Sequence, residues 1–510
     1  MRILRARPIV LASLILLCAA CPARAQEPVD RAMIARIRAE GLERSQVWPM
    51  FDTLVNVFGP RLTATPQYRG AATWARDKLA SWRLQQPRLE AWPFGRGWQL
   101  EHMTVEMVEP RYMPLMAYPQ AWSGSTPGEI VAAPTWLAGK SVAEVQAMAS
   151  SLKGAIVMTQ PMMTSFIRSD RVQPSESEAS AAAAAAAADS AARQGGRGRG
   201  GRGGRGGGRG GRGGDEPTVA SVIRDAGAAV ELRRGGGEHG TLFVLGPNRT
   251  DPTTPGIVIA GEHYNMIARM LEHRVPVKLR VNLRTRYLTA DTNGYNVIAE
   301  IPGSDPVLRD EVVMVGGHLD SWHSSPGATD NADGSAVVLE AARILRAINA
   351  QPRRTIRFAL WAGEEQGLLG ATQWVQRNLL GDANAAAREK FSVYFNIDPG
   401  TGPIYGWFLQ GNNAVGPIFD AWLEPFKDLG ARRNVAASIG NTDHLRFTAA
   451  GVPGFNPIQD YVDYDVRTHH TNVDTFERVK PEDLRQASVI LASFAWHAAM
   501  RAEKLPRPTP

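Results

Sequence analysis

Five segments in the second half of the chain carry closely spaced histidines and carboxylates. In order they are GGHLDSW (316–322), GATDNADGSA (327–336), WAGEEQGLLG (361–370), FNIDPGTG (395–402) and THHTNVDT (468–475). The candidate side chains that they offer are His318, Asp320, Asp330, Glu364, Glu365, Asp398 and His470. Imidazole and carboxylate groups suit Zn²⁺, and a dinuclear site needs one bridging carboxylate and two terminal ligands for each ion. The segments therefore predict a hydrolase with two metal ions.

Buried strands precede several of these segments and would position them. The runs VVMVG (312–316), TIRFALW (355–361) and FSVYFNI (391–397) are apolar and β-branched, and helical stretches separate them. Strands that alternate with helices predict a largely parallel sheet covered by helices on both faces. The candidate ligands follow the carboxyl ends of these strands, where open α/β sheets place their sites.

The 510 residues are too many for one small domain, and two or more domains are expected. Residues 26–124 are interpreted as the first part of the catalytic domain and 291–505 as its main part. Between them, 125–290 contains short β-branched runs such as 256–261 and 277–286, which predict a mostly β inserted domain. The stretches 152–160 and 238–246 are predicted to contribute strands to that same domain.

The amino terminus predicts export. MRILRARP, an apolar run from Ile9 to Ala20 and the small-residue pattern 23–25 are typical of a secretory signal peptide (1–25), and the apolar run is too short to span a membrane. We expect a secreted or periplasmic protein without a transmembrane segment in the mature chain. Cleavage after Ala25 would remove both cysteines, Cys18 and Cys21, and so exclude disulfides and thiolate ligands. Lipid anchoring through Cys21 is a weaker alternative, because the residues before it match a lipoprotein signal poorly.

The basic character of the chain belongs to one insert. Seven arginines lie in the glycine-arginine repeat 193–212 and four in the signal peptide, and without them the net charge of +7 becomes −4. The insert 173–217 has almost no large apolar residue, which predicts disorder because it cannot offset the entropy of ordering. A Gly-Arg repeat is also typical of polyanion binding. In an exported chain, and with no aromatic residue in the repeat, a surface loop is favoured and a nucleic-acid partner is not expected.

These motifs resemble those of the cocatalytic-zinc exopeptidases, which include bacterial aminopeptidases and carboxypeptidase Q. The segments that carry the resemblance are HLDSW (318–322), EEQG (364–367) and the paired histidines before the dipeptide Asp474-Thr475. The likeness covers most of 26–500 apart from the insert. It implies a zinc exopeptidase fold, in which a mostly parallel mixed sheet is flanked by helices, and a protease-associated domain inserted at about 125–290.

The resemblance also implies a role for each candidate residue. His318 and Asp398 would be terminal ligands of one zinc, Glu365 and His470 terminal ligands of the other, and Asp330 the bridge. Asp320 would orient the His318 imidazole, as metal-bound histidines require. Glu364 would be the general base, taking a proton from the metal-bridging water and delivering it to the leaving amine.

Some positions admit a second interpretation. A single His-x-Asp or Glu-Glu pair is usually a solvated surface feature, and it is the ordered set of five motifs that favours a site. Asp333 could be mistaken for the bridging carboxylate, but it is also suited to cap the helix that begins near Gly334. The family's spacing selects His470 over its neighbour His469, where many relatives have a tyrosine, so the group that stabilises the oxyanion is left open. NTDHLRF (441–447) resembles a stretch near the substrate pocket, yet Asp443 and His444 would equally suit a structural role. His263 and His323 match no motif.

Taken together, the sequence predicts an exported dinuclear zinc exopeptidase that removes an N-terminal residue or cleaves a short peptide such as a dipeptide. Peptide is the expected partner, and a homodimer is left open. One alternative is a noncatalytic receptor on the same fold, against which the complete ligand set counts. Another is a secreted polyanion-binding protein that acts through its Gly-Arg repeat, which would show salt-sensitive binding.

Overall fold

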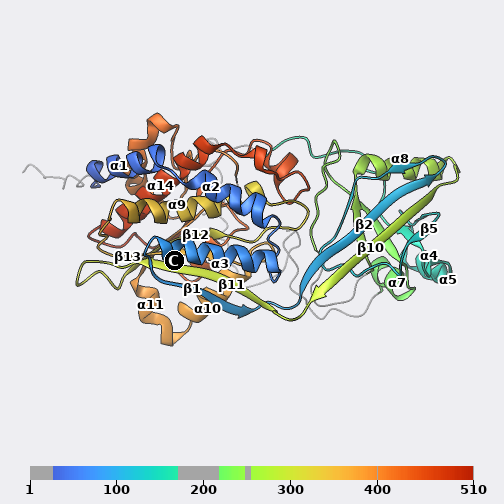
Figure 1. The fold of residues 1–510 in the computed structure, drawn as a ribbon, viewed down its shortest axis with the longest axis horizontal. Helices are drawn as coiled ribbons and strands as arrows, with labels where there is room; N and C mark the ends of the chain where they lie inside the picture. The colour runs from blue at the N-terminus through green and yellow to red at the C-terminus, as the bar shows by residue number, and fades with distance from the viewer. Residues whose placement is uncertain (1–26, 171–216, 247–253, 399, 509–510) are drawn as a thin grey trace, which may run out of the picture.

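A computed structural model describes residues 27–170, 217–246, 254–398 and 400–508. The predicted signal peptide 1–25 and the predicted insert 173–217, apart from Pro217, lie outside these residues. The described chain forms two bodies joined by a long two-stranded ribbon (Figure 1). None of the helices in the described ranges has the length and apolar character needed to cross a membrane.

The larger body is built around a seven-stranded mixed sheet. Across the sheet the strands are β1 (Gln85–Pro93), β11 (Asn293–Ile301), β13 (Thr355–Trp361), β12 (Val312–His318), β14 (Phe391–Asn396), β16 (Gly454–Ile458) and β15 (Gly406–Phe408). The four strands from β13 to β16 run parallel. The pairs at both sides of this centre are antiparallel. The expected parallel arrangement therefore holds for the central strands that precede the candidate ligands, whereas the sheet as a whole is mixed.

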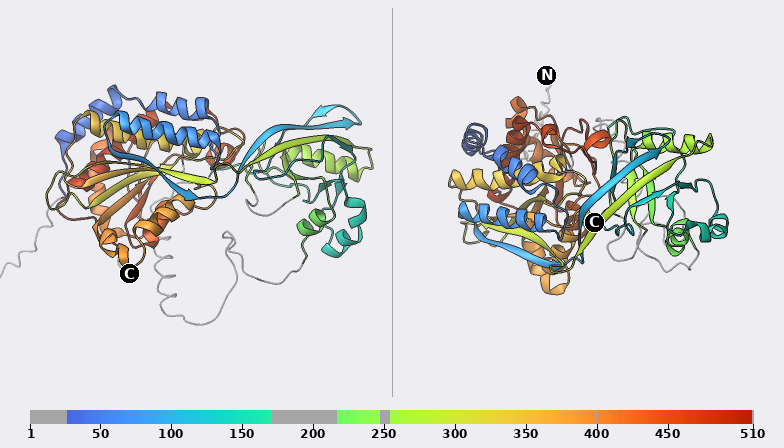
Figure 2. Two further views of the ribbon diagram at one scale, coloured as in Figure 1. Left: turned by 60° about the horizontal axis from the view of Figure 1, so that its bottom comes forward. Right: turned by 45° about the vertical axis from the view of Figure 1, so that its right-hand side comes forward.

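Alternate residues of the central strands pack into different cores, as the two-residue period of a strand requires. Val313 and Val315 of β12 face one apolar core, and Met314 between them faces another. The first core is covered by α1 (Arg31–Arg38), α2 (Val47–Asp52), α3 (Pro66–Ser81), α9 (Asp333–Ala347), α12 (Gly416–Leu423) and α14 (Pro481–Met500). The second core is covered by α10 (Leu369–Asn378) and α13 (His444–Ala449). Helices thus cover both faces, and Figure 2 shows the blue α2 and α3 on the side of the sheet opposite α10.

Local sequence explains where the site-bearing helices begin. Thr65 caps α3 by accepting a hydrogen bond from the Tyr68 N–H, and Pro66 occupies the first helical position, where its missing N–H costs nothing. α9 follows directly on the turn that contains Asp330 and is buried along most of its length. The buried apolar side chains of this helix pack against α14 and α2.

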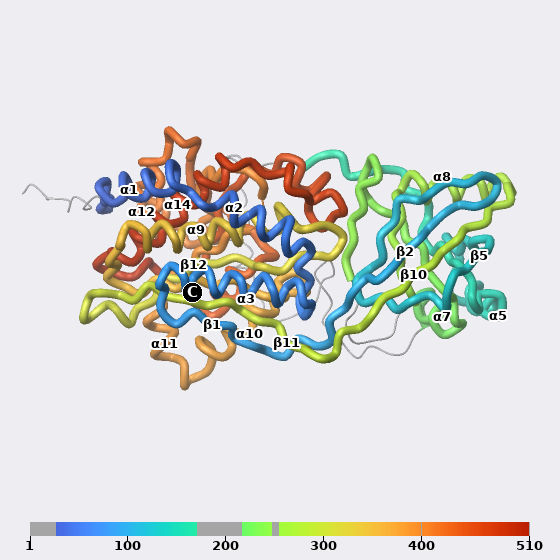
Figure 3. The backbone as a smooth tube through the Cα atoms, in the orientation of Figure 1, coloured from blue at the N-terminus to red at the C-terminus, as the bar shows by residue number. Residues whose placement is uncertain are grey.

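The smaller body, here called the inserted domain (97–288), is entered and left through one antiparallel ribbon. β1 pairs with β11 in the main sheet, and the continuing strands β2 (Gly97–Glu109) and β10 (Lys278–Leu288) pair along almost their whole length (Figure 3). The predicted boundary at 125 falls about thirty residues too late, since β2 already belongs to the inserted domain. A long strand that crosses from one body to the other leaves no break in the residue pattern that could mark the boundary.

Two sheets and four described helices make up the inserted domain. The first sheet contains β3 (Met113–Pro114), β2, β10 and β5 (Ile130–Ala132). The second contains β4 (Ala117–Pro119), β9 (Gly256–Ile259), β8 (Val230–Arg234), β7 (Ile156–Met158) and β6 (Thr135–Trp136). The helices are α4 (Val142–Ala147), α5 (Ala149–Leu152), α7 (Val219–Asp225) and α8 (Gly261–Glu272). Strands predicted at 152–160, 256–261 and 277–286 are therefore confirmed.

The prediction of a strand at 238–246 is wrong. This segment belongs to neither sheet of the inserted domain and forms only an isolated bridge between Phe243 and Thr471 of the larger body. Its apolar side chains Leu242 and Val244 are buried, as those of a strand would be. The backbone hydrogen bonds of Leu242 and Val244, however, go to the loop of the fifth motif, which no local pattern could reveal.

Candidate metal centre

The candidate ligands meet at the carboxyl edge of three neighbouring parallel strands. His318 is the last residue of β12, Glu364 and Glu365 follow β13, and Asp398 follows β14. β12 lies between β13 and β14 in the sheet, so these chain ends open on the same edge. His470 reaches the same place from a loop after the π-helical turn Tyr464–Thr468. The structure thus brings all seven candidate side chains into one region.

One group of side chains surrounds the Nε2 atom of His318. This atom lies 3.2 Å from Oδ1 of Asp330 and 3.5 Å from Oδ1 of Asp398. The other ring nitrogen, Nδ1, lies 2.9 Å from the backbone carbonyl oxygen of Asp320. Because a carbonyl oxygen only accepts hydrogen bonds, Nδ1 donates in this contact, and Nε2 is the ring nitrogen that faces the two carboxylates.

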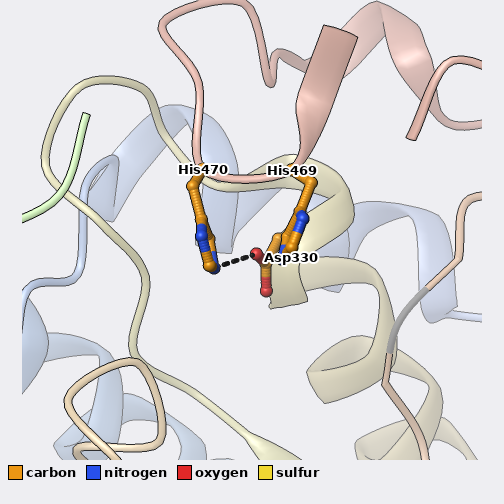
Figure 4. Close-up of side chains that lie close together, drawn as sticks. All are labelled: Asp330, His469 and His470. Atoms are coloured by element: carbon orange, nitrogen blue, oxygen red, sulfur yellow. Dashed lines mark ion pairs between the residues drawn. The ribbon is translucent and has the colours of Figure 1, made fainter. Parts of the chain in front are cut away.

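A second group surrounds the Nε2 atom of His470. It lies 2.9 Å from Oε2 of Glu365 and 3.3 Å from Oδ2 of Asp330. Figure 4 shows the His470 ring directed at the Asp330 carboxylate, with the neighbouring His469 ring on the other side. Asp330 therefore offers one carboxylate oxygen to each group, which is the arrangement that a bridging ligand requires.

Asp474 holds the backbone of the turn that carries Asp330. Its Oδ1 accepts a hydrogen bond from the Thr329 N–H at 2.8 Å, and its Oδ2 accepts one from the Asp330 N–H at 3.2 Å. On the other side of the turn, the Asn331 side chain donates to the Ile397 carbonyl oxygen at 2.9 Å. Asp330 is thus fixed by contacts from both the fifth and the fourth motif.

The expected role of Asp320 is met by its backbone more closely than by its carboxylate. The carboxylate oxygen Oδ1 lies 3.7 Å from Nδ1 of His318, farther than the carbonyl oxygen. The carboxylate instead accepts hydrogen bonds from the Thr63 hydroxyl at 3.1 Å and from the Glu364 N–H at 3.2 Å. Asp320 therefore connects the His318 strand to the loop that carries the glutamate pair.

Burial and like charges perturb the acidic side chains strongly. Burial raises the pKa of Glu364 well above its usual value, and the nearby Asp398 and Asp443 carboxylates raise it further. The pKa of Glu365 is also raised, first by burial and then by Asp330. Burial opposes ionisation of Asp330 as well, but the hydrogen bond from His318 and the charges of His470, His318 and His469 outweigh it and lower its pKa. Perturbed titratable groups of this kind cluster at functional sites.

The donor set of these residues fits a bound divalent metal. Oδ2 of Asp330 and Oε1 of Glu365 are buried and accept no hydrogen bond within the described residues. Buried carboxylates at this density need a compensating cation, since isolated buried charges are very costly. The described residues contain two clusters of potential metal ligands, and within each cluster the ligand atoms lie within 4.8 Å of one another. Both clusters contain Asp330. One adds His318 and Glu365, and the other adds His469 and His470. Nitrogen and carboxylate donors without thiolates suit zinc.

His469 lies beside the proposed ligand rather than in its place. Its ring stacks on Tyr464, with centroids 5.0 Å apart, and lies 3.9 Å from the His470 ring centroid. His470, and not His469, makes the short contact with Glu365. His470 is thus the histidine that contacts Glu365, whereas both histidines lie close to Asp330.

Asp333, His263 and His323 make hydrogen bonds of a structural kind. Asp333 lies in the first turn of α9, where its Oδ1 accepts a hydrogen bond from the Gly334 N–H at 2.6 Å. His263 accepts a hydrogen bond from the Met116 N–H, and His323 donates to the Pro119 carbonyl oxygen at 2.7 Å. His444 is fully buried, and burial lowers its pKa to about 4.

Three residues of this region carry roles that motif reasoning did not assign. Arg61 is fully buried and donates to the Leu319 carbonyl oxygen at 2.8 Å and to that of Gly327 at 3.0 Å. Thr63 and Asp474 hold Asp320 and Asp330 as described above. Asp474 could have been found, because it lies in the fifth motif. Arg61 and Thr63 lie more than 250 residues from the groups they bind, and no local spacing indicates them.

Comparisons with known proteins agree with this architecture. Residues 296–495 match the model of peptidase family M28. Human carboxypeptidase Q is 30% identical over 256 residues, which span 50% of this chain and 52% of that protein. The rat carboxypeptidase Q is 28% identical over 94% of this chain and 91% of its own.

Solved structures extend the likeness to both bodies. A peptidase M28 precursor from Shewanella amazonensis superposes with a TM-score of 0.69 and 25% identity, over 94% of this chain and 99% of the other. A zinc aminopeptidase from Bacillus subtilis shares the fold with a TM-score of 0.58 and 17% identity, over 90% and 96% of the two chains. Residues 296–495 therefore resemble peptidase family M28, and the chain is similar to carboxypeptidase Q over most of its length.

Proposed function

We propose that the protein is an exported dinuclear zinc exopeptidase that hydrolyses the terminal peptide bond of short peptides. The observation that carries the proposal is the division of Asp330 between two groups, with Oδ1 facing His318 and Oδ2 facing His470. Export rests on the signal-like segment 1–25 alone. The match of residues 296–495 to a peptidase family supports the reaction class.

The proposed ligands divide into two sets that share one member. His318 and Asp398 would hold one zinc, His470 and Glu365 the other, and Asp330 would bridge them. When bound, the two ions would supply an activated water molecule and polarise the scissile carbonyl group. The chain itself must then place a base, hold its ligands rigidly and stabilise the leaving group.

Glu364 is the proposed base. Its neighbour Glu365 is directed at His470, whereas Glu364 lies within the electrostatic influence of Asp398 and His318. Its backbone N–H is fixed by Asp320, which the Thr63 hydroxyl fixes in turn. A carboxylate held in this way would accept the proton of the attacking water and donate it to the departing amine.

Substrate termini distinguish exopeptidase from endopeptidase action. Purified metal-free protein should be reconstituted with zinc and assayed on a peptide library in free, N-acetylated and C-amidated forms. Cleavage that N-acetylation abolishes would identify an aminopeptidase, and cleavage that C-amidation abolishes would identify a carboxypeptidase. A dipeptidase would need both free ends. Internal cleavage of peptides blocked at both ends would overturn the proposal.

A further inference from the structure

The loop 463–474 carries His470 and belongs to the larger body, yet part of its conformation depends on the inserted domain. Two residues of this loop, Asp463 and His470, adopt left-handed backbone conformations with φ of +61°. That region is disfavoured for residues with a Cβ atom, so surrounding contacts must hold the chain there. Both residues have such a contact, and in each case the partner lies in the inserted domain.

Asp170 of the inserted domain holds the first end of the loop. Its Oδ2 accepts a hydrogen bond from the Asp463 N–H at 2.8 Å, and its Oδ1 accepts one from the Val466 N–H at 3.0 Å. The segment before Asp170 is itself tied to the inserted domain. The Ile167 N–H donates to the Gly236 carbonyl oxygen, and Arg168 forms an ion pair with Glu238. The Asp170 carboxylate is therefore an anchored acceptor.

The segment 240–244 of the inserted domain holds the second end. The Val244 N–H donates to the carbonyl oxygen of His470 at 2.9 Å. Leu242 and Asn472 exchange two hydrogen bonds, one from the Leu242 N–H to the Asn472 side chain at 2.7 Å and one from the Asn472 N–H to the Leu242 carbonyl oxygen at 3.2 Å. Leu242 and Val244 are 1% and 0% exposed, so this contact is packed as well as hydrogen-bonded.

We propose that the inserted domain positions the metal ligand His470, and that Asp170 and Asn472 are the positioning residues. This inference rests on the proposed function, since it assumes that His470 binds zinc. His318 is the last residue of β12 and Asp398 lies two residues after β14, so both are positioned by the sheet of the larger body. The hydrogen bonds to Asp170 and those with the segment 240–244 are here called the two clamps. Their loss should therefore weaken the zinc site of His470 and Glu365 and spare the site of His318 and Asp398.

The test uses the full chain with three alanine variants. Asp170→Ala removes both acceptors of the first clamp, Asn472→Ala removes the side-chain hydrogen bond of the second, and neither residue is among the proposed ligands. Asp225→Ala is the matched control, because Asp225 lies on the same domain but is exposed and pairs only with its neighbour Arg224. Zinc binding to metal-free protein is followed by calorimetric titration. Hydrogen exchange of peptides that cover 463–474 is measured in the metal-free protein, where zinc cannot mask a change.

Wild-type and control protein should bind two zinc ions. In each clamp variant we expect one site to keep its affinity and the other to weaken tenfold to a hundredfold, the usual effect of losing a group that orients a metal ligand. The loop 463–474 should exchange faster while the thermal midpoint stays near that of the control. Asp170→Asn, which keeps one acceptor oxygen, should lose less affinity than Asp170→Ala.

The outcomes separate the two proposals. Wild-type protein that binds fewer than two zinc ions would refute the proposed function itself. Two unaltered zinc affinities in both clamp variants, with unaltered exchange of the loop, would refute the positioning role alone. Equal weakening of both zinc sites, together with a lowered thermal midpoint, would also refute it, because it would show a general loss of folding.

Discussion

Replacing Glu364 by glutamine should abolish most turnover and leave both zinc ions bound. The amide keeps the shape of the side chain but cannot accept a proton from water. Removal of a general base costs on the order of 10²–10⁴ in rate, which corresponds to about 2.7–5.4 kcal/mol at 1.36 kcal/mol per tenfold change. The hydrogen bond from the Glu364 N–H to Asp320 involves the backbone and should persist in the variant.

The neighbouring residue provides the matched comparison. Oε2 of Glu365 lies 2.9 Å from Nε2 of His470, and its Oε1 is buried without a hydrogen bond in the described structure. Loss of a group that merely orients a ligand weakens metal binding by about 10–100-fold, so loss of the ligand itself should cost at least as much. Glu365→Gln should therefore release one zinc ion at concentrations where Glu364→Gln keeps two.

Folding stability provides a control for both variants. Burial and the carboxylates around Glu364 raise its pKa, so its charged form is unfavourable in metal-free protein. A neutral amide should then leave the thermal midpoint of metal-free protein unchanged or slightly higher. Turnover at saturating substrate and zinc content are measured on the same preparations. Full activity in Glu364→Gln, or loss of zinc from that variant and not from Glu365→Gln, would show that the two roles are reversed.

Three further predictions concern the metal content, the Gly-Arg repeat and one buried histidine. Active protein should contain close to two equivalents of metal, and a chelator should abolish turnover that zinc restores; full activity of metal-free protein would rule out metal catalysis. Deleting the repeat 193–214 while keeping Asp170 should leave peptidase activity and thermal midpoint nearly unchanged and lower any affinity for polyanions. A folded variant without activity would contradict the assignment of the repeat as a peripheral loop. Burial lowers the pKa of His323 in the folded protein to about 4, whereas a histidine in the unfolded chain has a pKa of about 6.5. The neutral imidazole therefore contributes to the free energy of unfolding above pH about 6.5, and this contribution is lost as the pH falls from about 6.5 to 4. The loss amounts to about 3 kcal/mol. In denaturant titrations, the free energy of unfolding should differ less between pH 7 and pH 4.5 for His323→Gln than for the wild type. Equal differences in the two proteins would argue against a buried neutral imidazole.

Much of the larger body could be predicted because its signals are local. β12, β13 and β14 are short apolar runs, and α9 shows a helical apolar stripe, so periodicity identified them within a few residues. The chemical types of the candidate ligands were equally local, because few residue types bind zinc. Their convergence also followed, since the carboxyl ends of neighbouring parallel strands open on one edge.

The limits of the inserted domain and the contacts that hold the site depended on the tertiary structure. The residues of β2 would suit a strand of either body, and only the pairing of β2 with β10 assigns it to the inserted domain. The strand-like segment 238–246 binds the His470 loop instead of a sheet, because its buried apolar side chains fit either partner. Thr63 and Asp320 are 257 residues apart. The sequence by itself determined which side chains could bind metal and on which strands they lie, because periodicity and ligand chemistry are local properties. The tertiary structure decided what orients them, since hydrogen bonds between distant segments leave no periodic trace in the chain.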